Sequence, residues 1–164
     1  MDRWGDPAHV DDPAPVVEAL AKVLAWQGEL GGASLQLDAA LRLLLGTRQP
    51  ALATTVLSSS ADVLARLGHL DLARRRLDQA VVVEQRAGNK AVSSLLLGRL
   101  SRLALRTGDV ARARIHGEEL LALARQMGAR PFEAWALDEL GRAERAAGNL
   151  RAARASFLAS LRLC

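Results

Sequence analysis

Four short stretches of the sequence repeat one another at intervals of 40 residues. They are GELGGASLQL at 28–37, GHLDLARRRL at 68–77, GDVARARIHG at 108–117 and GNLRAARASF at 148–157. Each begins with a glycine and has an alanine five residues later, at Ala33, Ala73, Ala113 and Ala153. A period of this length is typical of a solenoid, in which copies of one small unit stack side by side. The repeat therefore limits the fold to an array of similar units.

Each copy reads as two helices joined by a turn at the repeated glycine. Alanine and leucine, which are strong helix formers, dominate the apolar residues, and no stretch alternates with the two-residue period of a strand. A glycine such as Gly148 ends a helix readily in the left-handed conformation. Asp109 and Asn149 are suitable caps for the helices that follow. The predicted helices span residues 14–27, 31–45, 51–67, 70–86, 91–107, 110–127, 131–147 and 150–163.

Equivalent positions of the copies predict how these helices pack. The column of alanines marks a point of close approach within each pair, because a larger side chain would force the helices apart. A second column holds the larger residues Leu37, Leu77 and Phe157, with a gap at Gly117. We expect an all-α, right-handed solenoid of four helix-turn-helix repeats with a period of 40 residues.

The four copies fill most of the chain. We expect one repeat domain over 13–164, with repeats at about 13–50, 51–90, 91–130 and 131–164, after a flexible acidic lead-in at 1–12. The N-terminus lacks the apolar run of a signal peptide, and no window is apolar enough to span a membrane. The single cysteine, Cys164, forms no internal disulfide and favours a reducing compartment. These features predict a cytoplasmic protein without a membrane partner.

The last copy carries the residues of a known helical repeat. In the tetratricopeptide repeat (TPR), the first helix holds a Leu-Gly pair, Gly-Asp or Gly-Asn forms the turn, and the second helix holds Ala and then a bulky residue. The matching residues are Leu140-Gly141, Gly148-Asn149, Ala153 and Phe157, with Gly108-Asp109 and Ala113 in the third copy. The chain resembles a TPR array, which implies a binding scaffold whose first helices line a concave groove.

The sequence also departs from the TPR pattern. Its period is 40 residues rather than about 34, which lengthens the helices. The usual first-helix tyrosine is replaced by Leu24, Leu64, Ala104 and Glu144, and the helix-closing proline occurs only as Pro50 and Pro131. Longer copies of this composition resemble the helical-repeat regions of bacterial signal-transducing ATPases and LuxR-type transcriptional regulators. That resemblance implies a sensor or partner-docking arm of a regulator.

By the TPR register, basic residues recur along the implied groove. Arginine suits such a surface because its guanidinium forms two parallel hydrogen bonds to a carboxylate or phosphate. An aromatic residue there can anchor a peptide. The candidate ligand-binding residues are Lys22, Trp26, Arg66, Arg102, Arg106, Arg142 and Arg145.

A simply solvated helix face is the alternative interpretation. Acid–base pairs at i,i+4 stabilise an exposed helix by roughly 0.2–0.5 kcal/mol each without any ligand. Such pairs are Glu18–Lys22, Asp62–Arg66 and Asp138–Arg142. Arg102, Arg106 and Arg145 have no local partner of this kind. Of Trp26 and Trp135, one is expected to lie in the core.

Signals of catalysis, metal binding and nucleic-acid binding are weak. His116 and Glu119 share a helix face but lack the further ligands that a metal requires. No Ser-His-Asp or Cys-His motif is present. Arg74, Arg75 and Arg76 form a basic cluster without neighbouring aromatic residues, which argues against binding of single-stranded nucleic acid. We expect no catalytic residues, no metal and no cofactor.

The last helix presents apolar residues that no further repeat covers. We expect Leu158, Leu161 and Leu163 to be partly exposed, either because the chain is a piece of a longer protein or because they form a homodimer. The expected function is a non-catalytic scaffold or sensor that binds a protein or peptide with acidic groups. A regulatory domain for a small acidic effector is the alternative, and a helical enzyme with His116 in a polar pocket is the third.

Overall fold

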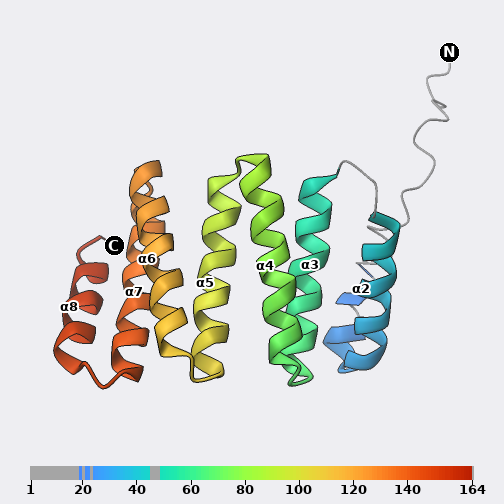
Figure 1. The fold of residues 1–164 in the computed structure, drawn as a ribbon, viewed down its shortest axis with the longest axis horizontal. Helices are drawn as coiled ribbons and strands as arrows, with labels where there is room; N and C mark the ends of the chain where they lie inside the picture. The colour runs from blue at the N-terminus through green and yellow to red at the C-terminus, as the bar shows by residue number, and fades with distance from the viewer. Residues whose placement is uncertain (1–18, 20, 23, 45–48, 164) are drawn as a thin grey trace, which may run out of the picture.

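The computed structural model describes residues 19, 21–22, 24–44 and 49–163, which form helices joined by short turns (Figure 1). The helices are α2 (Leu30–Leu44), α3 (Pro50–Arg66), α4 (Leu70–Ala87), α5 (Lys90–Arg106), α6 (Val110–Met127), α7 (Arg130–Ala146) and α8 (Leu150–Leu161). Helical residues at 24–27 precede α2, and the described residues contain no strand. The prediction of an all-helical repeat is confirmed. The lead-in at 1–12, Cys164 and part of the first predicted helix lie outside the described residues.

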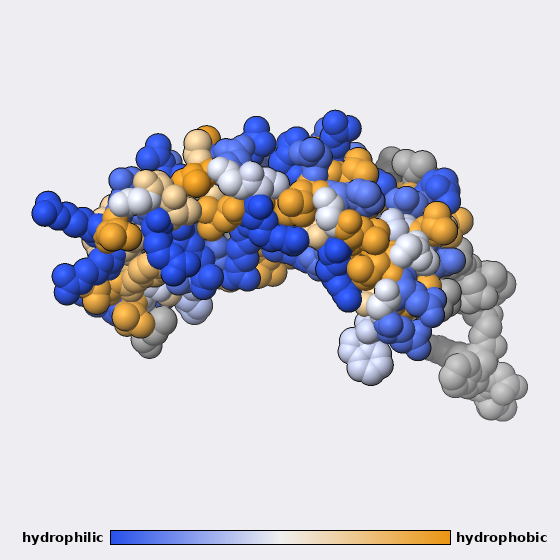
Figure 2. Space-filling model, turned by 90° about the horizontal axis from the view of Figure 1, so that it is seen from below, coloured by the Kyte–Doolittle hydropathy of each residue, from blue (hydrophilic) through white to orange (hydrophobic). Residues whose placement is uncertain are grey.

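Consecutive helices pack against each other and form one continuous stack. The pairs are α3 with α4, α5 with α6 and α7 with α8, and α4 contacts α5 as α6 contacts α7. Because α5 also contacts α7, the first helices of the last two pairs lie beside each other. Figure 2 shows that the stack bends into an arch that is hollowed on one side.

The repeated glycine ends the first helix of each pair. Gly108 follows α5 with φ of 78°, a left-handed conformation that residues with a Cβ rarely adopt. Asp109 then caps α6 as predicted, because its side chain accepts a hydrogen bond from the Arg112 backbone at 3.0 Å. Asn149 is the N-cap residue of α8, as predicted, but it forms no side-chain capping bond. Its side-chain nitrogen donates to Glu144 at 2.7 Å instead.

The alanine column lies where the paired helices touch, as predicted. Its members are between 0% and 3% exposed: Ala33, Ala73, Ala113 and Ala153. At one of these contacts, Ser101 Oγ of α5 donates to the carbonyl oxygen of Ala113 in α6 at 3.0 Å. A side chain thus reaches the backbone of the next helix directly, which a larger residue in the column would prevent.

Three glycines inside helices make room for large side chains of a neighbouring helix. The pairs are Gly98 with Trp135, Gly117 with Leu140 and Gly141 with Phe157. A Cβ atom at Gly117 would lie 2.8 Å from Leu140 Cδ2, and one at Gly141 would lie 2.6 Å from the Phe157 ring. Leu140 of the next repeat therefore fills the gap that Gly117 leaves in the apolar column.

Candidate ligand-binding groove

Two hollows open between the first helices of successive repeats, and we call the surface that contains them the groove. The basic hollow lies between α3 and α5, has a volume of about 380 Å³ and includes Asp62, Arg99, Arg102 and Arg106 in its lining. The apolar hollow lies between residues 21–26 and α3 and has a volume of about 270 Å³. Asp62 lines both hollows, so they are neighbours on either side of α3.

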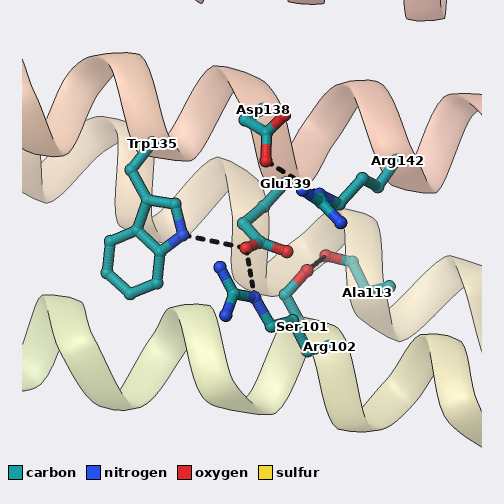
Figure 3. A network of polar contacts seen from close by, with 7 residues as sticks. All are labelled: Ser101, Arg102, Ala113, Trp135, Asp138, Glu139 and Arg142. Atoms are coloured by element: carbon teal, nitrogen blue, oxygen red, sulfur yellow. Dashed lines mark hydrogen bonds and ion pairs between the residues drawn. The ribbon is translucent and has the colours of Figure 1, made fainter.

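A buried carboxylate fixes one arginine of the basic hollow (Figure 3). Glu139 of α7 is fully buried, and its Oε1 accepts hydrogen bonds from Arg102 Nε at 2.6 Å and from Trp135 Nε1 at 2.8 Å. Its Oε2 has no hydrogen-bond partner among the described residues. The Arg102 guanidinium also lies 5.6 Å from the Trp135 ring centroid, a distance at which a cation attracts an aromatic face. Arg102 is thus held from two directions, yet 56% of its side chain is exposed.

The ion pairs across the groove share one spacing. Asp62 of α3 pairs with Arg99 of α5, and Arg102 of α5 pairs with Glu139 of α7. In both cases the partners are 37 residues apart. The acid comes first in the chain in the pair of Asp62 with Arg99, and the base comes first in the pair of Arg102 with Glu139. These pairs therefore join the first helices of successive repeats at equivalent places.

Two other arginines bind back to the preceding repeat. Arg66 Nη1 donates to the carbonyl oxygen of Ala25 at 2.7 Å, and Arg106 Nη2 donates to that of Ala65 at 2.9 Å. Both carbonyls lie near the end of the preceding first helix, where a cation is favourable. The predicted i,i+4 pair of Asp62 with Arg66 is wrong, because both side chains bind other repeats.

The arginines of the basic hollow keep most of their donors available. Arg99, Arg102 and Arg106 each use one guanidinium nitrogen for the bond described above. Their other nitrogens make no hydrogen bond within the described part of the chain. Asp62 and Glu139 balance two of the three positive charges, so the hollow keeps an excess of one. Guanidinium groups that are already positioned bind a carboxylate or phosphate at a reduced entropic cost.

Comparison with solved structures identifies the fold. BtubC (BKLC) from P. vanneervenii has a TM-score of 0.82 at 20% identity, and the match covers 99% of this chain and 66% of that one. A putative kinesin light chain of Podosopora anserina with TPR-like repeats has a TM-score of 0.81 at 17% identity, and the match covers 96% of this chain and 79% of that one. This chain is a TPR-like α-solenoid. It spans just under two thirds of the length of BtubC, and no protein-family model and no curated protein matches it.

Two predicted residues of the TPR-like groove lie on α7, beyond the basic hollow. Arg142 pairs with Asp138 at 2.7 Å, which confirms this predicted i,i+4 pair. The hydrogen bond that Arg142 Nε donates to Asp138 raises the pKa of the Arg142 guanidinium above its ordinary value. The Arg145 side chain is exposed and makes no ion pair or hydrogen bond with the described residues. Arg142 and Arg145 therefore lie at this outer end of the groove, whereas Arg102 and Arg106 line the basic hollow.

The remaining predicted residues lie at the apolar hollow. Lys22 and Trp26 line it together with Arg66. Trp26 is 87% exposed, whereas Trp135 is half-buried against Gly98, so Trp135 is the one that packs between helices. The predicted partner of Lys22, Glu18, lies outside the described residues.

The sequence reasoning missed Arg99, which lines the basic hollow, and Glu139, the buried carboxylate that holds Arg102. Both occupy the same column of the repeat, three positions before the column of Arg102 and Arg142. The spacing of 37 residues between opposite charges, Asp62 to Arg99 and Arg102 to Glu139, is the signal that identifies them.

The weak catalytic and metal signals gain no further ligands from the fold. His116 Nδ1 lies 3.4 Å from Glu119 Oε2, as their spacing predicts. Over 19–44 and 49–163, apart from positions 20 and 23, no three His, Cys, Asp or Glu side chains gather where they could hold a metal ion. None of the helices described here is long and apolar enough to cross a membrane.

The basic cluster of α4 is largely neutralised by acidic neighbours. Arg74 pairs with Asp78 at 3.2 Å, and Arg76 pairs with Asp38 of α2 at 2.7 Å. Arg75 between them is exposed. Two of the three arginines therefore take part in ion pairs of the fold itself.

Proposed function

We propose that this chain is a non-catalytic binding module whose groove holds a protein or peptide segment with acidic groups. The observation that carries the proposal is the basic hollow, where three arginines face one space and each is fixed through a single nitrogen. The TPR-like fold supports a scaffold role, because stacked repeats present extended surfaces to their partners. Such a module acts within a regulator or signalling protein.

Removing charge from the groove tests this proposal. The variant Arg99→Gln/Arg106→Gln removes two cations and leaves the pair of Arg102 with Glu139 intact. A random 12-residue peptide display library selected on the wild-type chain is expected to yield segments rich in Asp and Glu. Their Kd, measured by fluorescence anisotropy, is expected to rise about tenfold or more in this variant, since charged hydrogen bonds contribute about 1.5–3 kcal/mol each.

The matched control makes the same charge change on the second helices. Arg75 and Arg114 are exposed on α4 and α6, so Arg75→Gln/Arg114→Gln leaves the groove untouched. It is expected to bind the selected peptides as tightly as the wild type. Equal weakening in both variants, or selected peptides without acidic residues, contradicts the proposal.

A small acidic effector is the second candidate ligand. The basic hollow, at about 380 Å³, falls within the size range of small-molecule sites, which is roughly 300–1,000 Å³. Titration with citrate and succinate, followed by calorimetry, separates the two ligands. Binding of these ions without selection of any acidic peptide favours the effector.

We further propose that α8 mediates homodimer formation. Leu158 and Leu161 are three residues apart and 43% and 69% exposed, and Leu163 is half-buried. Contiguous exposed leucines of this kind mark contact surfaces.

Light scattering is expected to show a dimer whose population rises with concentration. The variant Leu158→Glu/Leu161→Glu is expected to leave a monomer with an unchanged helical circular dichroism spectrum. A wild-type chain that stays monomeric at every concentration contradicts this.

A further inference from the structure

Trp26 differs from the residues at the same position of the next two repeats. Arg66 and Arg106 occupy that position and reach back to the carbonyl oxygens of Ala25 and Ala65. Trp26 instead is 87% exposed. So large an exposed aromatic surface contributes little to folding, and exposed aromatic residues recur as anchors of binding surfaces.

The hollow beside Trp26 has apolar walls and a polar rim. Its walls include Ala21, Ala25, Leu37 and Val63, and its rim includes Lys22, Asp62 and Arg66. The bond of Arg66 to Ala25 ties the two first helices together at this hollow, so it is formed before any ligand arrives. A preformed apolar cavity with a few polar groups at its edge suits one aliphatic or aromatic side chain.

The apolar and basic hollows lie one repeat apart along the groove. Asp62 lines both, so a single extended segment that crosses α3 passes over each of them. The ion pair of Arg99 with Asp62 and the hydrogen bond of Arg106 to Ala65 join α3 to α5, which places the two helix axes roughly 10 Å apart. A polyproline II segment rises about 3.1 Å per residue and returns to the same face every three residues. Two side chains three positions apart in such a segment are therefore about as far apart as the two hollows, and they point to the same side of the segment.

We propose that the groove recognises a bipartite segment, with an apolar side chain beside Trp26 and an acidic side chain three residues away in the basic hollow. The acidic residue meets Arg99, Arg102 and Arg106, whose available donors and excess positive charge complement a carboxylate. The apolar residue stacks on Trp26 and enters the hollow. This inference rests on the proposed function and adds the chemistry and spacing of the partner.

A set of fluorescein-labelled decapeptides tests the inference. Each contains one leucine and one glutamate in a background of proline, alanine and serine, at separations from i,i+1 to i,i+6 and in either order. Anisotropy titrations with the wild-type chain are expected to give the lowest Kd at a separation of three. Replacing the leucine by serine or the glutamate by glutamine is expected to raise that Kd about tenfold.

Variants of the protein show which hollow binds the leucine of the peptide and which binds its glutamate. Trp26→Ser is expected to abolish the dependence on the leucine and keep that on the glutamate, whereas Arg99→Gln/Arg106→Gln is expected to do the converse. Leu35→Ser is the control, because Leu35 is 69% exposed on α2, away from the groove.

The failures of the two proposals are distinguishable. Binding that depends on the glutamate alone, with Trp26→Ser equal to the wild type, overturns the bipartite inference and leaves the acidic groove standing. A lowest Kd at another separation overturns the spacing. Binding that depends on neither residue overturns both proposals.

Discussion

Replacing Arg102 with methionine is expected to destabilise the fold by about 2–4 kcal/mol, because it leaves a buried carboxylate without its cation. Glu139 is fully buried, and its Oε1 accepts from Arg102 and Trp135. Its Oε2 has no hydrogen-bond partner among the described residues. Once Arg102 is removed, only the indole of Trp135 still bonds the carboxylate in the described surroundings. Urea unfolding followed by circular dichroism measures the change.

The second residue of the pair provides the control. Glu139→Gln removes the buried charge but keeps an oxygen that accepts from Trp135, so Arg102→Met/Glu139→Gln is expected to unfold within about 1 kcal/mol of the wild type. Glu139→Gln alone leaves a half-exposed Arg102 that water can solvate, and its effect is expected to be small. The double-mutant cycle then gives a large coupling energy. An Arg102→Met variant as stable as the wild type contradicts the assignment of Glu139 as a buried charge.

The repeat period allowed the fold to be predicted from the sequence, because it fixes local structure. The glycine at each turn needs a left-handed backbone, as Gly108 shows with φ of 78°. The alanine column needs closely packed helices, and its members are buried. Both signals act within one repeat, over a few residues, so they do not depend on how neighbouring repeats are placed. The helix boundaries follow from the same local signals.

The contacts of the groove could not be predicted in the same way, because they join different repeats. Asp62 has two possible ion-pair partners in the sequence. Arg66 follows it at i,i+4, and Arg99 lies 37 residues later, in the next repeat. The structure selects Arg99, since Arg66 reaches the carbonyl oxygen of Ala25. Which tryptophan packs depends likewise on its neighbour: Trp135 faces Gly98 of the preceding repeat. Such choices require the offset between successive first helices, which the period alone does not give.

Replacing Gly98 with alanine is expected to destabilise the fold by about 1–3 kcal/mol, although alanine favours helices. A Cβ at this position would overlap Cζ2 and Cη2 of the Trp135 ring. The ring cannot turn aside freely, because its Nε1 donates to Glu139 at 2.8 Å and Arg102 lies against its face. The clash therefore forces α5 and α7 apart, at the contact between the third and fourth repeats. Thermal and urea unfolding measure the loss.

The same substitution at Gly31 is the matched control, because Gly31 lies in α2 and a Cβ there meets no atom within 4 Å. Gly31→Ala is expected to leave stability unchanged or raise it by up to about 1 kcal/mol, from helix propensity alone. In a Trp135→Phe background the loss from Gly98→Ala is expected to shrink, since phenylalanine lacks the outer ring of the indole. A Gly98→Ala variant that gains as much stability as Gly31→Ala shows that Trp135 does not fill the space above Gly98. In that case, the contact between α5 and α7 does not depend on matched small and large residues.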